Sequence, residues 1–222
     1  MGEEEIHLAH KAQSLGLDVA PLTKEQAQAL EPEIELDVLG AVHYGCDAHL
    51  YPNKLIPQLI SYLKNAGVKF ETGHEVEKMI TANGQIKKVV TAGNSYEADL
   101  VVVAGGSWLP QLTKMAGIVL PLMPGKGYSF MQNNPAKKLN VPSIFCEARV
   151  AITPMNGGIR YGGTMEIAPV NNKINMNRVE GIVNSVTKYF SNVKLDMPEE
   201  KNVWYGFRPV TPDGIPYIGR SK

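Results

Sequence analysis

The residues best suited to chemistry lie near the end of the sequence, around a single arginine. If residues 204–208 form a strand, its period of two places Trp204, Gly206 and Arg208 on one face. A glycine inside a strand weakens it and often marks a place where something approaches the backbone closely. The following Thr211-Pro212-Asp213-Gly214 has the composition of a β-turn. We therefore expect Arg208 to be held rigidly beside an open space, as in a carboxylate-binding site.

The same spacing fits equally well an arginine with a structural role. Arg208 would then form an ion pair beside two crowded turns. Glu147 and Glu166 are acidic residues that could pair with Arg208 or Arg160, because a buried cation needs a partner. Both also fit surface positions, so the pattern alone leaves the two interpretations open.

A second candidate site follows the apolar run at residues 100–104. Gly105 and Gly106 come next and precede an expected helix that opens near Trp108. The end of a strand, paired glycines and a helix N-terminus together can bind a phosphate or the edge of a flavin. Many α/β proteins make the same turn for packing reasons only, and the pattern by itself favours packing.

Two other kinds of catalytic site have little support. His43, Cys46 and His49 are three residues apart, but on a segment that runs from strand to loop they would not converge, and no fourth ligand is near. We therefore expect no metal. The sequence has no G-x-S-x-G motif, so it does not support a hydrolase triad.

Composition narrows the class of protein. At 222 residues, the chain is long enough for one sizeable core or two modest lobes. Lys and Arg number 22, as do Asp and Glu, so no net charge attracts nucleic acid or a membrane surface. No apolar run has the length of a membrane-spanning helix, and the acidic N-terminus lacks the apolar core of a signal peptide. Two cysteines, Cys46 and Cys146, give no disulfide framework, which predicts a cytoplasmic location.

The elements that position these residues divide into two kinds. Helices are expected at 3–15, from the capping box at Thr23 to near Pro32, and at 52–66. Strands are expected at 39–44, 68–70, 75–82, 85–91 and 98–106, the last one buried and parallel. The hairpin signal Asn83-Gly84 makes a β-meander of the middle strands. This order is typical of the second half of a nucleotide-binding α/β domain.

The second half of the sequence predicts an antiparallel sheet with a covering helix. The expected strands are 128–132, 149–154, 158–163 and 201–210, and the expected helix is 176–190.

Several of these segments together resemble one family, the flavin-dependent amine and D-amino-acid oxidoreductases, which includes D-amino-acid dehydrogenase, glycine oxidase and sarcosine oxidase. Residues 206–219 resemble its segment G-[LF]-R-P-x-T-P-D-G-x-P-x-[IV]-G. Residues 98–108 resemble the family's A-D-x-V-V-x-A-x-G-[AS]-[WY]-[ST]. Residues 124–128 and 162–166 resemble P-x-K-G-Y and G-G-T-x-E. The resemblance extends over nearly the whole chain.

The resemblance implies an FAD-dependent enzyme that oxidises D-amino acids by hydride transfer to the flavin. Arg208 would bind the carboxylate of a small amino-acid substrate, and no strong general base, and so no catalytic residue, is implied. The implied FAD contacts are Val76, Ala104, Gly105, Gly106 and Trp108. The electron acceptor is left open.

The implied fold is α/β plus α+β: a partial FAD-binding, Rossmann-like lobe with a β-meander, joined to a substrate lobe with a mainly antiparallel sheet. The expected segments are a helical segment (1–38), the partial FAD lobe (39–119), the substrate lobe (120–210) and a return segment (211–222).

The sequence departs from the family pattern in two places. The sequence contains no G-x-G-x-x-G, the motif that holds the FAD pyrophosphate. We therefore expect an internal fragment of a longer enzyme that binds FAD weakly and is inactive by itself. The alternative is a non-enzymatic module that binds carboxylates or a partner without FAD. In addition, Ala151 stands where relatives such as glycine oxidase place a carboxylate-binding tyrosine, which resembles the dehydrogenase branch and leaves the substrate class in doubt.

Overall fold

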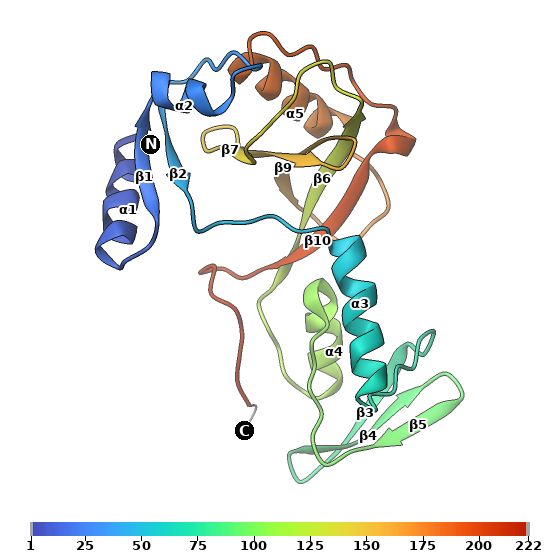
Figure 1. Cartoon of the computed structure of the whole chain (residues 1–222). Helices are drawn as coiled ribbons and strands as arrows, with labels where there is room; N and C mark the ends of the chain where they lie inside the picture. The colour runs from blue at the N-terminus through green and yellow to red at the C-terminus, as the bar shows by residue number, and fades with distance from the viewer. Residues whose placement is uncertain (1, 221–222) are drawn as a thin grey trace. The chain divides into compact units, whose positions relative to one another are not determined.

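A computed structural model of the chain describes residues 2–220, which form two compact units (Figure 1). The first unit contains the residues up to His49 together with Gly127–Glu166 and Asn172–Gly206. The second contains Leu50–Lys126, Ile167–Asn171 and the residues from Phe207 onward. Each unit is therefore made of several separate stretches of sequence, whereas each of the four predicted segments is one continuous stretch. The division into those four segments stays a prediction.

The N-terminal part of the first unit is a helix, a hairpin and a second helix. Helix α1 (Gly2–Ser14) precedes β1 (Val19–Thr23), which pairs antiparallel with β2 (Gly40–Tyr44). Helix α2 (Lys24–Leu30) begins at the predicted capping box, in which the Gln26 amide donates to Thr23 Oγ1. Both helices and β2 were predicted correctly. Strand β1 was not predicted because it contains Pro21, which is confined to the edges of sheets.

A five-stranded sheet forms the centre of the first unit. Its strand order is β10-β6-β9-β8-β7, and the pairs β7–β8 and β8–β9 are antiparallel. The β8–β9 pair agrees with the predicted antiparallel sheet. The strands are β6 (Met123–Asn133), β7 (Ser143–Phe145), β8 (Val150–Met155), β9 (Gly158–Ile167) and β10 (Trp204–Val210). The short β7 was not predicted, and the expected start of β10 is instead the 3₁₀ turn η2 (Glu200–Asn202).

Helix α5 (Met176–Tyr189) covers this sheet, as predicted (Figure 1). Its buried face consists of Val179, Ile182, Val183 and Val186. These side chains pack in one core with Ile152 and Tyr161 of the sheet. Burying each aliphatic side chain stabilises the unit by about 1.5–3 kcal/mol, so this face fixes the sheet beneath it.

The second unit combines helices with a three-stranded meander. Helix α3 (Pro52–Asn65) and the strands β3 (Val76–Ala82) and β4 (Gln85–Thr91) agree with the predicted elements. Strand β5 (Asn94–Glu97), the third strand of the meander, was not predicted. Asn83 and Gly84 both have positive φ, at 52° and 70°, as the tight hairpin turn requires. The 3₁₀ turn η1 (Gly106–Trp108) leads into the short helix α4 (Leu109–Met115).

Two strands expected in the second unit are not formed, so that part of the prediction was wrong. Residues 68–70 and 98–105 have no assigned strand structure. A parallel strand exists only when a neighbour completes its hydrogen-bond ladder, and no strand of residues 2–220 pairs with either segment. The apolar side chains that would be buried in such a sheet are exposed, by 68% at Leu100 and 79% at Val102.

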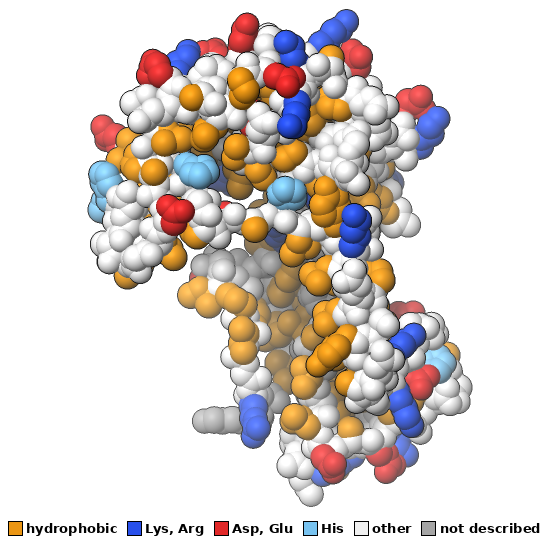
Figure 2. Space-filling view, in the orientation of Figure 1, with side chains coloured by type: hydrophobic (Ala, Val, Ile, Leu, Met, Phe, Trp, Pro, Cys, Tyr) orange, Lys and Arg blue, Asp and Glu red, His pale blue; other side chains and the backbone are white. Residues whose placement is uncertain are grey.

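Helix α3 shares this exposure. It is strongly amphipathic, yet none of its residues is buried. Its apolar face remains at the surface at Leu55, Ile56, Leu59 and Tyr62. Hydrophobic side chains accordingly gather at the surface of this unit in Figure 2. The pattern of α3 predicts a helix packed on a sheet, and the described residues supply the helix without that sheet.

Candidate functional site

The strand and turn around Arg208 form as predicted. Arg208 lies on β10 and is exposed. In the turn, the Gly214 amide donates to the Thr211 carbonyl at 3.3 Å, and Gly214 has a φ of 75°. The Ile215 amide donates to Asp213 Oδ1 at 3.1 Å, which fixes the chain leaving the turn. The turn thus limits the movement of the end of β10, two residues after the arginine.

The space beside Gly206 is filled, which corrects one expectation. A Cβ at this glycine would collide with the indole of Trp204, which lies across the backbone of residue 206. The guanidinium of Arg160 lies over the same indole, 5.6 Å from its centroid. The glycine leaves room for the side chain two residues earlier, which folds over it. It does not leave an open space.

The acidic residues considered as partners of the arginines have other contacts. Glu166 accepts a hydrogen bond from Asn175 at 3.0 Å and lies 3.8 Å from Nε of Arg178. Arg160 donates from Nε and Nη2 to the Ser129 hydroxyl. Glu147 is exposed. The pKa of Tyr189 is raised first by burial and second by the negative charge of Glu147. Of the two roles left open for these acids, pairing with Arg160 or Arg208 is therefore not observed among the described residues.

Arg208 itself is available to a ligand. Within residues 2–220, its guanidinium forms no ion pair with a carboxylate. An arginine in this condition fits a carboxylate-binding role better than a structural one, because its five N–H donors remain open to solvent.

The two glycines of the second candidate site have different explanations. A Cβ at Gly105 would meet the end of the Leu112 side chain of α4, a packing contact that movement of the leucine side chain would relieve. Gly106 has a φ of 54°, and no atom lies within 4 Å of an added Cβ. Its conformation favours glycine, and the space beside its backbone is open.

Ser107 is a feature of this segment that the sequence did not single out. Its side chain is 6% exposed, and among the described residues its Oγ has no hydrogen-bond partner. A buried hydroxyl without a partner is costly, so it usually marks a missing ligand or water. Together with the open backbone at Gly106, this atom fits a polar ligand group such as a flavin. Sequence reasoning could not predict the burial of one serine.

Val76 and Trp108 complete the set of residues predicted to contact the cofactor. Val76 is the half-buried first residue of β3 and pairs with Thr91. Trp108 ends η1 and packs edge-to-face against Phe207, with ring centroids 6.0 Å apart. Ala104 is exposed beside the glycines. The structure thus places Trp108 in contact with Phe207, the residue before Arg208 on β10.

Lys126 occupies the lysine position of the segment that resembles P-x-K-G-Y, but it was not among the predicted site residues. It is completely buried. Its ammonium donates to the carbonyl and side-chain oxygens of Asn171, at 2.9 and 3.0 Å, and lies 5.4 Å from the ring centroid of Phe207. Lysine is almost never fully buried, so composition and spacing gave no reason to expect it here.

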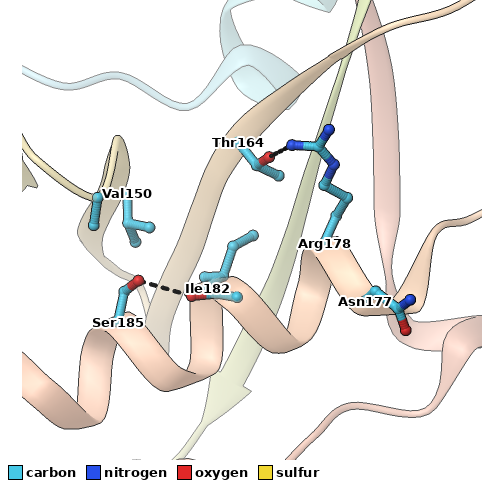
Figure 3. Close-up of a pocket in the computed structure, with 8 residues that line it drawn as sticks. Val150, Thr164, Asn177, Arg178, Ile182 and Ser185 are labelled. Atoms are coloured by element: carbon cyan, nitrogen blue, oxygen red, sulfur yellow. Dashed lines mark hydrogen bonds between the residues drawn. The ribbon is translucent and has the colours of Figure 1, made fainter.

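A pocket of about 360 Å³ lies between α5 and the strands β8 and β9 (Figure 3). It contains none of the predicted site residues. Three of its polar side chains form hydrogen bonds within the protein: Arg178 donates to Thr164 Oγ1 at 3.1 Å, and Ser185 donates to the Gly181 carbonyl at 2.7 Å. The pocket is therefore best explained by imperfect packing between α5 and the sheet.

The described residues give two further results. The side chains of His, Cys, Asp and Glu in residues 2–220 form no group of three that could hold a metal ion. No helix in the same part of the chain is long and apolar enough to cross a membrane.

Comparison with known proteins decides the family. The sequence profile described as FAD dependent oxidoreductase matches residues 2–222. The chain belongs to this family. The family is one of flavoproteins, so the predicted cofactor, FAD, is the one its members use. The predicted mixed α/β fold with antiparallel sheets is confirmed.

Similar proteins of this FAD-dependent oxidoreductase family include two D-amino acid dehydrogenases. The one from Allorhizobium ampelinum is 35% identical over 76% of this chain and 40% of its own length. The one from Helicobacter pylori is 28% identical over 90% of this chain and 48% of its own length. The chain thus spans less than half the length of these relatives.

Solved structures show the same fold. Glycine oxidase from Geobacillus kaustophilus superposes with a TM-score of 0.85 and 22% identity, over 99% of this chain and 58% of that protein. L-proline dehydrogenase from P. horikoshii gives a TM-score of 0.81 and 25% identity, over 95% of this chain and 57% of that protein.

Proposed function

We propose that this chain is part of an enzyme that oxidises D-amino acids by hydride transfer from the α-carbon to FAD. The observation that carries the proposal is the exposed Arg208, without a carboxylate partner among the described residues, on a strand that ends in a hydrogen-bonded turn. The similarity to D-amino acid dehydrogenases supports the substrate class. No observation favours the non-enzymatic alternative.

In this proposal, Arg208 binds the substrate through its carboxylate. The planar guanidinium can donate to both carboxylate oxygens at once, which fixes the orientation of the α-carbon as well as the position. A charge-assisted hydrogen bond of this kind contributes about 1.5–3 kcal/mol. Because the neutral amine loses hydride directly, the chain needs no strong general base.

The proposed cofactor contacts are Val76, Ala104, Gly105, Gly106 and Trp108, with Ser107 added from its burial. FAD, when bound, supplies the hydride acceptor. The open backbone at Gly106 and the unpartnered Ser107 hydroxyl support contact with its polar groups. Ala151, half-buried on β8, offers no hydroxyl to a carboxylate, so Arg208 would bind the carboxylate without a tyrosine at this position. The small residue there favours the dehydrogenase branch of the family.

The location is proposed from composition alone. Two exposed free cysteines and no disulfide framework support a reducing, cytoplasmic compartment. Cell fractionation with an antibody to the protein would test this.

The test of function uses the flavin-loaded, full-length enzyme that contains this chain, with a D-amino acid under anaerobic conditions. Bleaching of the flavin absorbance is expected. Arg208→Ala should raise the apparent substrate constant by about 10- to 100-fold, because the charge-assisted bond is lost.

The matched control is Arg149→Ala, which removes an exposed arginine from another part of the chain. The control should leave the substrate constant unchanged. An unchanged constant in Arg208→Ala would show that this arginine does not bind the carboxylate, and no bleaching with any D-amino acid would reject the proposed activity.

A further inference from the structure

Lys126 lies at the centre of a chain of contacts within the second unit. Its buried ammonium is hydrogen bonded to both oxygens of Asn171. The Asn171 amide in turn donates to the Pro169 carbonyl, and the Ala168 amide donates to the Pro124 carbonyl. Residues 167–171 are thus held against the start of β6, and Lys126 is enclosed between them and the ring of Phe207.

Phe207 connects this lysine to the proposed cofactor segment. Its ring meets Trp108 edge-to-face, at an interplanar angle of 78° and a centroid distance of 6.0 Å. On the other side, its backbone is bonded directly to Arg208. Adjacent Cα atoms are about 3.8 Å apart, so the position of the Phe207 backbone determines that of Arg208.

The chemistry of the buried residue indicates a role beyond filling space. Burying an ammonium is costly, and an apolar side chain of similar volume would fill the same position without that cost. Hydrogen bonds and cation–π contacts are directional, in contrast to apolar packing. A lysine at this position therefore fixes the placement of the Phe207 ring more narrowly than a methionine would.

We propose that Lys126 is a positioning residue that acts through Phe207 and Trp108 to set the distance between the flavin-binding segment and Arg208. The inference rests on the proposed function. Hydride transfer requires reacting atoms in close, aligned contact, and a displacement of about 1 Å can lower the rate by about 100-fold. Lys126 touches neither substrate nor flavin in this proposal.

The kinetic test compares variants of the flavin-loaded, full-length enzyme that contains this chain. Lys126→Met and Phe207→Leu should each lower kcat by about 10- to 100-fold with a smaller change in KM, because Arg208 still binds the carboxylate but holds the substrate misplaced. Phe207→Tyr keeps the ring and should restore most of kcat. The double variant Lys126→Met/Phe207→Leu should fall no lower than the more affected single variant, since both changes break one contact chain.

The control is Lys188→Met. Lys188 also lies over an aromatic ring, 5.7 Å from the centroid of Tyr189, but at an exposed position. Its replacement should leave kcat unchanged. Strictly additive losses in the double variant, or unchanged kcat in folded Lys126→Met and Phe207→Leu proteins, would overturn the proposal.

A second measurement does not depend on activity. This chain has two tryptophans, so Trp204→Phe leaves Trp108 as its only tryptophan, whose fluorescence can be excited selectively. In that background, Lys126→Met and Phe207→Leu should shift the Trp108 emission to longer wavelength and raise its quenching by acrylamide, and Lys188→Met should change neither. Unchanged emission in both test variants would overturn the contact chain. Failure of the wild type to oxidise any D-amino acid, with the emission shift present, would instead reject the proposed function.

Discussion

Three glycines of this chain are glycines for three different reasons. Gly206 lies beneath the Trp204 indole, whose ring can move aside. At Gly163, a Cβ would come within 2.7 Å of the Arg149 carbonyl oxygen, which belongs to the neighbouring backbone and cannot move freely. Gly181, inside α5, has no atom within 4 Å of an added Cβ. The same residue type thus marks a movable contact, a fixed contact and open space.

Alanine at the last two positions should therefore change stability in opposite directions. Gly163→Ala should lower the free energy of unfolding by about 1–3 kcal/mol, because the backbone must shift. Gly181→Ala should raise it by about 0.5–1 kcal/mol, because alanine favours the helix and nothing obstructs it. Urea denaturation of both variants would measure the two effects. A destabilising Gly181→Ala would show that the space beside α5 is filled in solution.

Tyr161 should make the stability of the first unit depend on alkaline pH. Burial raises its pKa to about 12, and its hydroxyl donates to Gln132 Oε1 at 2.8 Å. The unfolded chain loses this proton near pH 10, before the folded chain does, so stability falls as pH rises from about 10 to about 12. The loss attributable to Tyr161 approaches about 2–3 kcal/mol at the upper end.

The measurement is the difference in unfolding free energy between wild type and Tyr161→Phe across this range. The phenylalanine variant lacks the ionisable group, so the wild type should lose its advantage as pH rises. A constant difference from pH 9 to 12 would contradict the assignment.

At the scale of elements, the end of α2 is joined to a distant loop by one buried carboxylate. Glu31 is 3% exposed and accepts hydrogen bonds from the backbone amides of Asn140 and Val141, at 3.0 and 2.6 Å. Burial raises its pKa, and these hydrogen bonds oppose the rise. Glu33 accepts the Lys138 amide of the same loop at 3.0 Å from an exposed position.

Removing the two carboxylates should therefore have unequal effects. Glu31→Ala should destabilise the protein by about 2–4 kcal/mol, because two part-buried amides lose their acceptor. Glu33→Ala should cost less than about 1 kcal/mol, because water replaces the carboxylate. Thermal or urea unfolding of the pair would test this. Equal losses would mean that burial does not distinguish the two sites.

At the scale of the whole molecule, the exposed apolar face of α3 should control the solution behaviour of the chain. Leu59 is 45% exposed, and α3 has no buried residue. Leu59→Lys should reduce self-association, with a change in unfolding free energy of less than about 0.5 kcal/mol. Ile182→Lys, at a fully buried position of α5, should instead prevent folding of the first unit.

Light scattering and urea denaturation would separate the two effects. Strong destabilisation by Leu59→Lys would show that the α3 face is buried in solution.

The sequence by itself determined the elements whose stabilising interactions are local: the capping box at Thr23, the Asn83-Gly84 hairpin, the turn ending at Gly214 and the amphipathic helices. It also determined the family, through consecutive motif residues such as those around Arg208. The strands predicted from the sequence at residues 68–70 and 98–105 were wrong, because a strand depends on a partner strand that hydrophobic periodicity does not reveal. Only the tertiary structure decided the burial of Lys126 and Ser107 and the filling of the space at Gly206, because each depends on side chains from elsewhere or on a rotamer. Contacts between residues that are close in sequence can be predicted from the sequence, whereas contacts between residues that are distant in sequence depend on tertiary packing.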